Sequence, residues 1–341
     1  DFCLSRGLGD VYKRQVIIPI VCLYLLQCLL VPKYASDIKE GAMIKEYYNS
    51  EKNHDVLILG DCEVYENIST VTMWENYGIS SYIRGSAEQL IWQSYYLLED
   101  TLKYEKPQVV IVNVLAMTES DAKSEAYNRM TLDGMKLSKY KIASVRESMT
   151  EEENMASYIF PLLRYHSRWS ELSSEDFRYM WKTPSVTTNG YLMQKGVRPV
   201  TTIPKAAPLA NYTFSDRNME YLDKIYSLCK DNGINLVLMK APSVYPHWYD
   251  EWDKQVSDYA YEHGILYLNT INEAGNIGID YTTDTFDYGQ HLNVEGAEKL
   301  SLYLGEQLVK NFRLTDHRQD ESYKNAWQTI VNKYYEEKQG D

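Results

Sequence analysis

A cysteine that could act as a nucleophile follows the apolar run DVLIL, after the turn signal Gly60-Asp61. A tight turn from a strand into a helix exposes the side chain of Cys62 at the carboxyl end of a sheet, where α/β folds place their sites. A helix that starts at Cys62 would also favour the thiolate form. The alternative is that Cys62 is a small buried apolar residue, as free cysteines often are.

A histidine that could act as a base, His291, lies in the segment DTFDYGQHLN, shortly after Asp284 and Asp287 and before Gly296. A carboxylate at this spacing can bond one ring nitrogen of the histidine. That bond sets the tautomer and leaves the other nitrogen to accept a proton. Taken alone, a histidine of this kind is more often structural. Together with Cys62, it indicates acyl-transfer chemistry.

Four short apolar runs predict the buried strands that must position these residues: DVLILGD, PQVVIVNVL, INLVLMKAPS and ILYLNT. Helical spacing is present at residues 86–104, 218–232 and 293–312. Strands that alternate with helices indicate βαβ units around a mostly parallel sheet. The sequence therefore predicts a three-layer α/β/α domain over residues 54–312.

Residues 118–210 interrupt this alternation with several short helical patches, and we expect them to form an insertion or lid. Within them, Arg164 and Arg168 flank His166 and could grip an anionic substrate. The alternative is a solvated helix face anchored by Trp169. Residues 313–341 are charged and are expected to form a surface helix or a tail.

The apolar run VIIPIVCLYLLQCLLV, residues 16–31, predicts a single-pass membrane anchor, although it falls short of the ~20 residues of a full span. No small-residue cleavage site follows it, so we expect a retained anchor rather than a cleaved signal. The preceding SRGLGDVYKRQ resembles translated sequencing-adapter sequence, and residues 1–15 are therefore expected to be non-native. Residues 32–53 are expected to be a linker to a domain outside the cytoplasm. The alternative is a buried core helix.

The chain is acidic, with 48 Asp and Glu against 35 Lys and Arg and a net charge of −13. This balance argues against nucleic acid as a partner, because no dense basic face offsets it. Of the five cysteines, Cys62 and Cys229 fall in the globular part. Their number and spacing indicate neither a disulfide framework nor a zinc site.

These motifs, in this order, resemble the SGNH (GDSL) hydrolase superfamily over residues 54–312. Gly60-Asp61-Cys62 matches its GDS block with Cys in place of Ser, and the His291 segment matches its Asp-x-x-His block. The resemblance implies a flavodoxin-like sheet, Cys62 as nucleophile, His291 as base and Asp287 as the residue that orients it. It also implies that Gly85 and Asn113 donate hydrogen bonds to an oxyanion.

The chain departs from the family pattern at two further points. Asp287 precedes His291 by four residues rather than three, so Asp284 stays an alternative. The usual Gly-x-Asn-Asp block is absent from VNVLAM, so Gln89 rivals Asn113 as the donor. The resemblance implies no metal and no organic cofactor.

The resemblance and the anchor together imply a bacterial extracytoplasmic acyl-ester hydrolase or O-acyltransferase on the cell membrane. Its partner would be a cell-envelope glycopolymer or an acyl donor. The alternative is a non-catalytic envelope polysaccharide-binding or scaffold protein that keeps the fold and has an unreactive Cys62.

Overall fold

Five parallel strands form the sheet of the computed structural model, which describes residues 2–33, 39–182 and 184–340. Their order is β2-β1-β3-β4-β5, and every neighbouring pair is parallel. In this doubly wound order the connections leave β1 toward opposite edges, which opens a crevice at the carboxyl ends of β1 and β3. The strands are β1 (Val56–Gly60), β2 (Ser81–Gly85), β3 (Val109–Asn113), β4 (Asn235–Lys240) and β5 (Leu266–Asn269).

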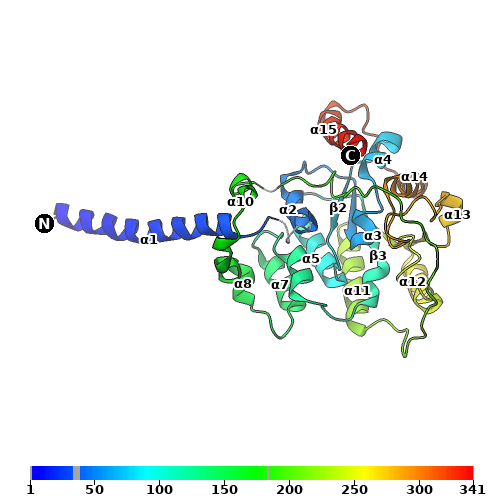
Figure 1. The fold of residues 1–341 in the computed structure, drawn as a ribbon, viewed down its shortest axis with the longest axis horizontal. Helices are drawn as coiled ribbons and strands as arrows, with labels where there is room; N and C mark the ends of the chain where they lie inside the picture. The colour runs from blue at the N-terminus through cyan, green and yellow to red at the C-terminus, as the bar shows by residue number, and fades with distance from the viewer. Residues whose placement is uncertain (1, 34–38, 183, 341) are drawn as a thin grey trace.

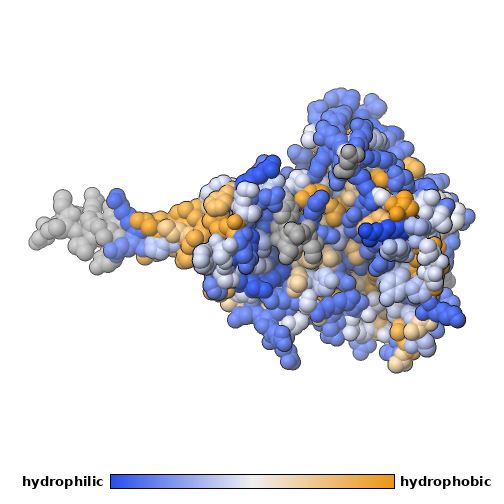
Figure 2. Space-filling view, viewed as in Figure 1, coloured by the Kyte–Doolittle hydropathy of each residue, from blue (hydrophilic) through white to orange (hydrophobic). Residues whose placement is uncertain are grey.

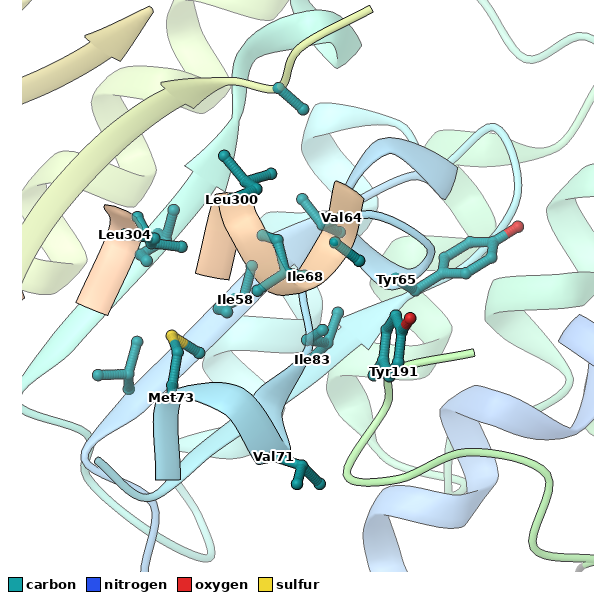
Figure 3. Packing of buried hydrophobic residues seen from close by; sticks show 14 of the residues in the cluster. Ile58, Val64, Tyr65, Ile68, Val71, Met73, Ile83, Tyr191, Leu300 and Leu304 are labelled. Atoms are coloured by element: carbon teal, nitrogen blue, oxygen red, sulfur yellow. The ribbon is translucent and has the colours of Figure 1, made fainter. Parts of the chain in front are cut away.

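Helices bury both faces of the sheet. Successive side chains of a strand point to opposite faces, so Val56 and Ile58 enter one apolar core while Leu57 and Leu59 enter the other. The first core is closed by α3 (Cys62–Tyr65), α4 (Thr70–Tyr77), α14 (Val294–Asn311) and α15 (Glu321–Gln339), and part of it is drawn in Figure 3. The second is closed by α5 (Ile91–Thr101), α7 (Lys139–Ser148), α11 (Asp216–Asp231) and α12 (Asp250–His263). The three-layer α/β/α fold is thereby confirmed.

The edge strand β2 has no counterpart among the four predicted strands, because its sequence, SYIRG, is not a continuous apolar run. Its Arg84 is 1% exposed and would be costly to bury alone. Its Nη1 donates to Asp100 Oδ2 at 3.3 Å, to Thr101 Oγ1 at 2.8 Å and to the carbonyl of Leu97 at 3.0 Å. These three partners come from α5, and Tyr48, from the segment before β1, accepts a further hydrogen bond from Arg84 Nη2 at 3.2 Å, so both segments make the burial of Arg84 possible.

The chain between β3 and β4 forms the expected helical insertion. Short helices occupy its first part: η3 (Val114–Thr118), α6 (Glu125–Leu132), α7, α8 (Met155–Ile159), α9 (Leu162–Tyr165), η4 (His166–Ser170) and α10 (Ser174–Arg178). Residues 184–215 then cross the domain without a helix or a ladder strand. The last short helix of the domain, α13 (Ala274–Ile277), follows β5.

Two segments are more closely packed than the sequence suggested. Within the expected linker, η1 (Lys39–Ala42), α2 (Met43–Glu46) and η2 (Tyr47–Asn49) bury Met43, Ile44 and Tyr47 against the domain. The segment is therefore part of the fold from residue 39 onward. At the other end, α15 stacks Trp327 on Trp74 of α4 with ring centroids 4.9 Å apart.

The first helix, α1 (Phe2–Leu30), projects away from the body of the protein (Figure 1). Its segment Lys13–Leu30 is long and apolar enough to cross a membrane and is mostly exposed. Figure 2 shows apolar side chains along the part of α1 that lies nearer the body. A helix with this composition and exposure fits a membrane anchor better than a core helix.

Candidate active site

Cys62 is the first residue of α3, and Asp61 alone separates it from the end of β1. Asp61 caps the helix, because its Oδ1 accepts a hydrogen bond from the Glu63 amide at 3.1 Å. Gly60 makes the turn possible: a Cβ on it would lie 2.8 Å from Cβ of Asn113 on β3. The half-buried Cys62 therefore sits at the carboxyl edge of the sheet, next to the crevice between β1 and β3.

His291 is bonded to Asp287 through two contacts. Its Nδ1 lies 2.6 Å from Asp287 Oδ2, and its backbone amide donates to Asp287 Oδ1 at 2.8 Å. The four-residue spacing is accommodated by a loop in which Tyr288 and Gly289 have φ values of 66° and 89°. Nδ1 is thus occupied, and among the described residues no hydrogen bond reaches Nε2. This is the arrangement in which an imidazole exchanges a proton through Nε2.

Two residues that follow Cys62 hold the His291 loop beside the nucleophile position. Asn67 Oδ1 accepts a hydrogen bond from the Leu292 amide at 2.8 Å, and Glu66 Oε2 lies 3.3 Å from His291 Nδ1. Glu66 is held in turn by Gln194 Nε2 at 2.6 Å. Segments more than 220 residues apart are therefore joined at one edge of the sheet. Among the described residues no hydrogen bond links Cys62 Sγ to His291.

The carboxylates around His291 favour its charged form. Burial alone would lower its pKa, but the bond to Asp287 and the charges of Glu66, Asp287 and Glu63 outweigh it and raise the pKa of His291 to about 9. At neutral pH the imidazole is therefore mostly protonated. In that state it can donate a proton but cannot accept one.

The position of Cys62 at a helix start suggested a lowered pKa for its thiol, but in the structure this pKa is raised. Burial, followed by the charges of Asp61, Glu66 and Glu63, raises the pKa of Cys62 well above its usual value. The dipole of α3 cannot offset this, because the helix has only four residues. The expectation of a thiolate at neutral pH is corrected: the resting side chain is a neutral thiol.

Two acids of the site titrate near neutrality. Burial raises the pKa of Asp61 to about 7, with a further contribution from the charge of Glu63. Burial likewise raises the pKa of Glu66 to about 7, against the opposing charge of His291. The negative charge that faces Cys62 and His291 therefore grows as the pH passes through this region.

A buried ion pair that sequence reasoning missed lies behind the nucleophile turn. Lys240, the last residue of β4, donates to Glu63 Oε1 at 2.6 Å and Oε2 at 2.8 Å. Ser243 Oγ donates to Glu63 Oε1 at 2.8 Å, and Lys240 also bonds Ser243 and the carbonyl of Ala241. A lysine at the end of an apolar strand, INLVLMK, was the signal for a buried partner.

Asn113 and Gln89, the two side chains predicted as oxyanion donors, form hydrogen bonds within the protein instead. Asn113 Nδ2 donates to Asp61 Oδ1 at 3.1 Å and Glu63 Oε2 at 3.0 Å, which uses both of its N–H groups. Gln89 Nε2 donates to the Arg84 carbonyl and to Ser94 Oγ. In this conformation neither amide is free for a substrate oxygen, because each holds a loop of the site together.

The backbone candidate Gly85 keeps a position consistent with its predicted role. It ends β2 opposite Gly60, and a Cβ on it would lie 3.0 Å from the Gly60 carbonyl. The residue therefore lies at the nucleophile turn. Its role as an oxyanion donor stays a prediction.

Asp284, the alternative partner of His291, is bonded elsewhere. Its Oδ2 accepts from Lys299 Nζ at 2.6 Å and from the Asp280 amide at 2.8 Å. The side chain is buried and ties the loop to α14, which begins after the cap residue Asn293. The geometry therefore pairs His291 with Asp287 and gives Asp284 a structural contact.

No family model matches the sequence, and no curated protein is similar enough to match it. Solved structures with a similar arrangement include a proposed acylhydrolase from Bacteroides fragilis, with 11% identity and a TM-score of 0.37 over 77% of this chain and 90% of that one. A proposed lipolytic protein of the G-D-S-L family from Desulfitobacterium hafniense has 13% identity and a TM-score of 0.37 over 75% and 100% of the two chains. A GDSL-like lipase from Bacteroides thetaiotaomicron has 11% identity and a TM-score of 0.39 over 80% and 100%.

The strand order around β1, the turn that carries Cys62 and the loop that carries His291 occupy the places implied by the motif order. The chain thus has a three-layer α/β/α fold that brings the two motifs together at one edge of a parallel sheet.

Proposed function

We propose that the protein is an acyl-ester hydrolase or O-acyltransferase whose nucleophile is Cys62, whose base is His291 and whose orienting carboxylate is Asp287. The observation that supports this most directly is the Asp287–His291 pair, with Nδ1 bonded at 2.6 Å and Nε2 unbonded among the described residues. Such a pair is not catalytic by itself, since His54 is bonded to Glu105 in the same way; it supports the proposal because Asn67 and Glu66 hold the His291 loop beside Cys62. Here the ring is largely buried next to α3 with one nitrogen left for chemistry.

The proposed reaction starts when the neutral His291 removes the proton of the Cys62 thiol as sulfur attacks the acyl carbonyl. Collapse of the tetrahedral intermediate expels the alcohol, which takes the proton back from His291, and leaves a thioester on Cys62. A water molecule or a sugar hydroxyl then attacks the thioester and releases the acid or the new ester. Because the first step needs an uncharged imidazole, the reaction is favoured above the His291 pKa of about 9.

The proposed substrate class follows from the anchor. The segment Lys13–Leu30 has the length and composition of a membrane span, so the domain would be held at the membrane surface. With the domain on the extracytoplasmic side, the polymers within reach would be cell-envelope glycopolymers. Their O-acyl esters or free hydroxyls would be the acyl donor or acceptor.

A second candidate is a non-catalytic envelope-binding or scaffold protein. It is favoured by one specific observation: burial and nearby carboxylates raise the pKa of Cys62, and nearby carboxylates raise the pKa of His291 against the opposing effect of burial. At neutral pH the site therefore holds a thiol and an imidazolium, which do not react with an ester. The two candidates differ in what happens when the pH rises.

We expect the full-length protein in detergent to form an acetyl thioester on Cys62 when treated with p-nitrophenyl acetate. The adduct would be followed by mass spectrometry of the Cys62 peptide, at early times to limit spontaneous hydrolysis of the probe. Its rate of formation should rise with pH and reach half of its plateau near pH 9, where His291 loses its proton.

Cys229→Ala is the matched control, because Cys229 is buried in α11 and burial raises its pKa to about 12. This variant should acylate at Cys62 as the wild type does. A rate at Cys62 that shows no plateau and does not change in His291→Ala would point to simple ionisation of the thiol. That outcome would reject the catalytic proposal in favour of the scaffold.

A further inference from the structure

A group of exposed apolar side chains surrounds the place where α1 meets the body. Every exposed Trp or Phe among the described side chains lies between residues 160 and 181, on or next to η4, α9 and α10. We call the following set the apolar rim: Phe160 (61% exposed), Leu163 (58%), Trp169 (72%), Phe177 (60%) and Trp181 (66%). Large aromatic residues exposed together, rather than scattered over a surface, mark an interaction site.

The apolar rim is physically tied to the end of α1. The helices α9, η4 and α10 all pack against α1, and Figure 1 shows α1 leaving the body between α8 and α10. Arg168 Nη1 donates to the carbonyl of Leu30 at 2.6 Å, and its Nη2 donates to Asp176 Oδ1 of α10 at 3.0 Å. Trp169 directly follows this arginine. The end of the helix and the rim therefore form one unit.

The length of α1 places this unit at the membrane surface. The apolar residues 16–30 of α1 rise about 22 Å at about 1.5 Å per residue, less than the ~30 Å thickness of a hydrocarbon core. A span of this length uses all of its residues to cross. Its last turn, which contacts the body through Leu30, then lies at the boundary between acyl chains and headgroups.

We infer that the apolar rim inserts into the headgroup–acyl boundary of the bilayer that α1 crosses, so that the domain lies on the membrane. The residue types fit this partner, since Trp is enriched at the interface and Arg and Lys flank it there. Exposed cations stand beside the aromatic residues, with Arg178 after Phe177 and Lys182 after Trp181. This inference takes α1 as a span but does not depend on the chemistry of Cys62.

Electrostatic attraction is not required for this contact. The exposed acids Glu171 and Glu175 lie in the same segment as the apolar rim and the cations, so the charge around the rim is mixed. The contribution that remains is burial of apolar surface at the interface, which does not need anionic lipid. We therefore expect the contact to form on uncharged phosphatidylcholine. The sequence analysis considered Arg164 and Arg168 as residues that could bind an anionic substrate. In the structure both are bonded within the protein: Arg168 bonds Leu30 and Asp176, and Arg164 Nε donates to Glu125 Oε1 at 3.1 Å.

The test is fluorescence quenching of the full chain reconstituted in phosphatidylcholine vesicles with and without brominated phosphatidylcholine. Flotation with the vesicles after an alkaline wash first establishes that α1 is inserted. Of the seven tryptophans, Trp169 and Trp181 are exposed, whereas the other five are buried or half-buried. We expect brominated lipid to quench the wild type and this quenching to be largely lost in Trp169→Phe/Trp181→Phe. Iodide in the buffer should have little access to Trp169 and Trp181.

The control is Tyr261→Trp in the double-variant background. Tyr261 is 90% exposed on α12, at the end of the body away from α1. A tryptophan there should be quenched by iodide and not by brominated lipid. If Trp169 and Trp181 behave like the control, the rim faces water and the inference is wrong. If neither quencher reaches them, another protein or a second copy covers the rim, which also overturns it. If the chain does not float with the vesicles, α1 does not span the bilayer, and the inference is wrong for that reason.

Discussion

The His291→Asn variant is expected to lose about 10²–10⁴-fold in kcat/KM toward p-nitrophenyl acetate, measured at the alkaline plateau. Asparagine can keep a hydrogen bond to Asp287 but cannot accept the thiol proton. Cys62, whose pKa is raised by burial and by Asp61, Glu66 and Glu63, then has no route to a nucleophilic thiolate. The loss should be in kcat more than in KM, because the imidazole acts on the proton rather than on substrate binding.

The chain offers a matched control in His317→Asn. His317 is also partly buried and also faces a carboxylate, with its Nε2 3.0 Å from Asp55 Oδ2. Asp55 lies at the opposite end of β1 from Cys62, so this variant should keep wild-type activity. Equal activity of His291→Asn and the wild type would remove His291 from the mechanism.

The same experiment can be extended to the pH profile through Glu66→Gln. The charge of Glu66 contributes to the raised pKa of His291, so its removal should lower that pKa. Because the neutral imidazole is the active form, the rise in kcat/KM should move to lower pH. A profile that moves to higher pH, or stays in place, would show that the limb near pH 9 belongs to another group.

The Lys240→Met variant is expected to be destabilised by about 3–5 kcal/mol, because it leaves the carboxylate of Glu63 buried without its cation. The two side chains are 0% and 1% exposed and 2.6 Å apart. Asn113 and Ser243 still donate to Glu63, but neither carries charge. The measurement is denaturant unfolding of the full chain in detergent, followed by tryptophan fluorescence.

Lys254→Met is the control for this prediction, since its ion pair with Asp258 has the same 2.6 Å length but is exposed, at 74% and 58%. A pair of this kind on a helix surface contributes roughly 0.3–0.5 kcal/mol. The double variant Glu63→Gln/Lys240→Met removes both charges and should recover much of the loss. If Lys240→Met is no more destabilised than Lys254→Met, the pair does not hold the nucleophile turn.

The buried pair also explains how Cys62 is positioned. Glu63 is the residue after Cys62, and Lys240 ends β4, two strands away from β1 in the sheet. Asn113 completes the link by bonding both Asp61 and Glu63 from the end of β3. The ends of three strands therefore hold one short helix, and a defect in this network should displace the thiol as well as weaken the fold.

The amino-acid sequence by itself determined the main plan of the fold. Four strands were predicted from continuous apolar runs, and β1, β3, β4 and β5 confirm them. Such runs are readable because a parallel strand buried on both faces needs apolar residues at every position. The edge strand β2 was not predicted because Arg84 interrupts its apolar run, and the burial of that arginine depends on partners on α5 and on Tyr48.

The contacts and charges of the candidate site were decided by the tertiary structure. Spacing left Asp284 and Asp287 as alternatives; the left-handed backbone at Tyr288 and Gly289 turns Asp287 toward His291, while Lys299 holds Asp284. The pKa of Cys62 likewise depends on Asp61, Glu63 and Glu66 lying close together in a buried site. Motifs name the residues that a site can use, whereas hydrogen-bond partners and electrostatic environment arise from segments that meet only on folding.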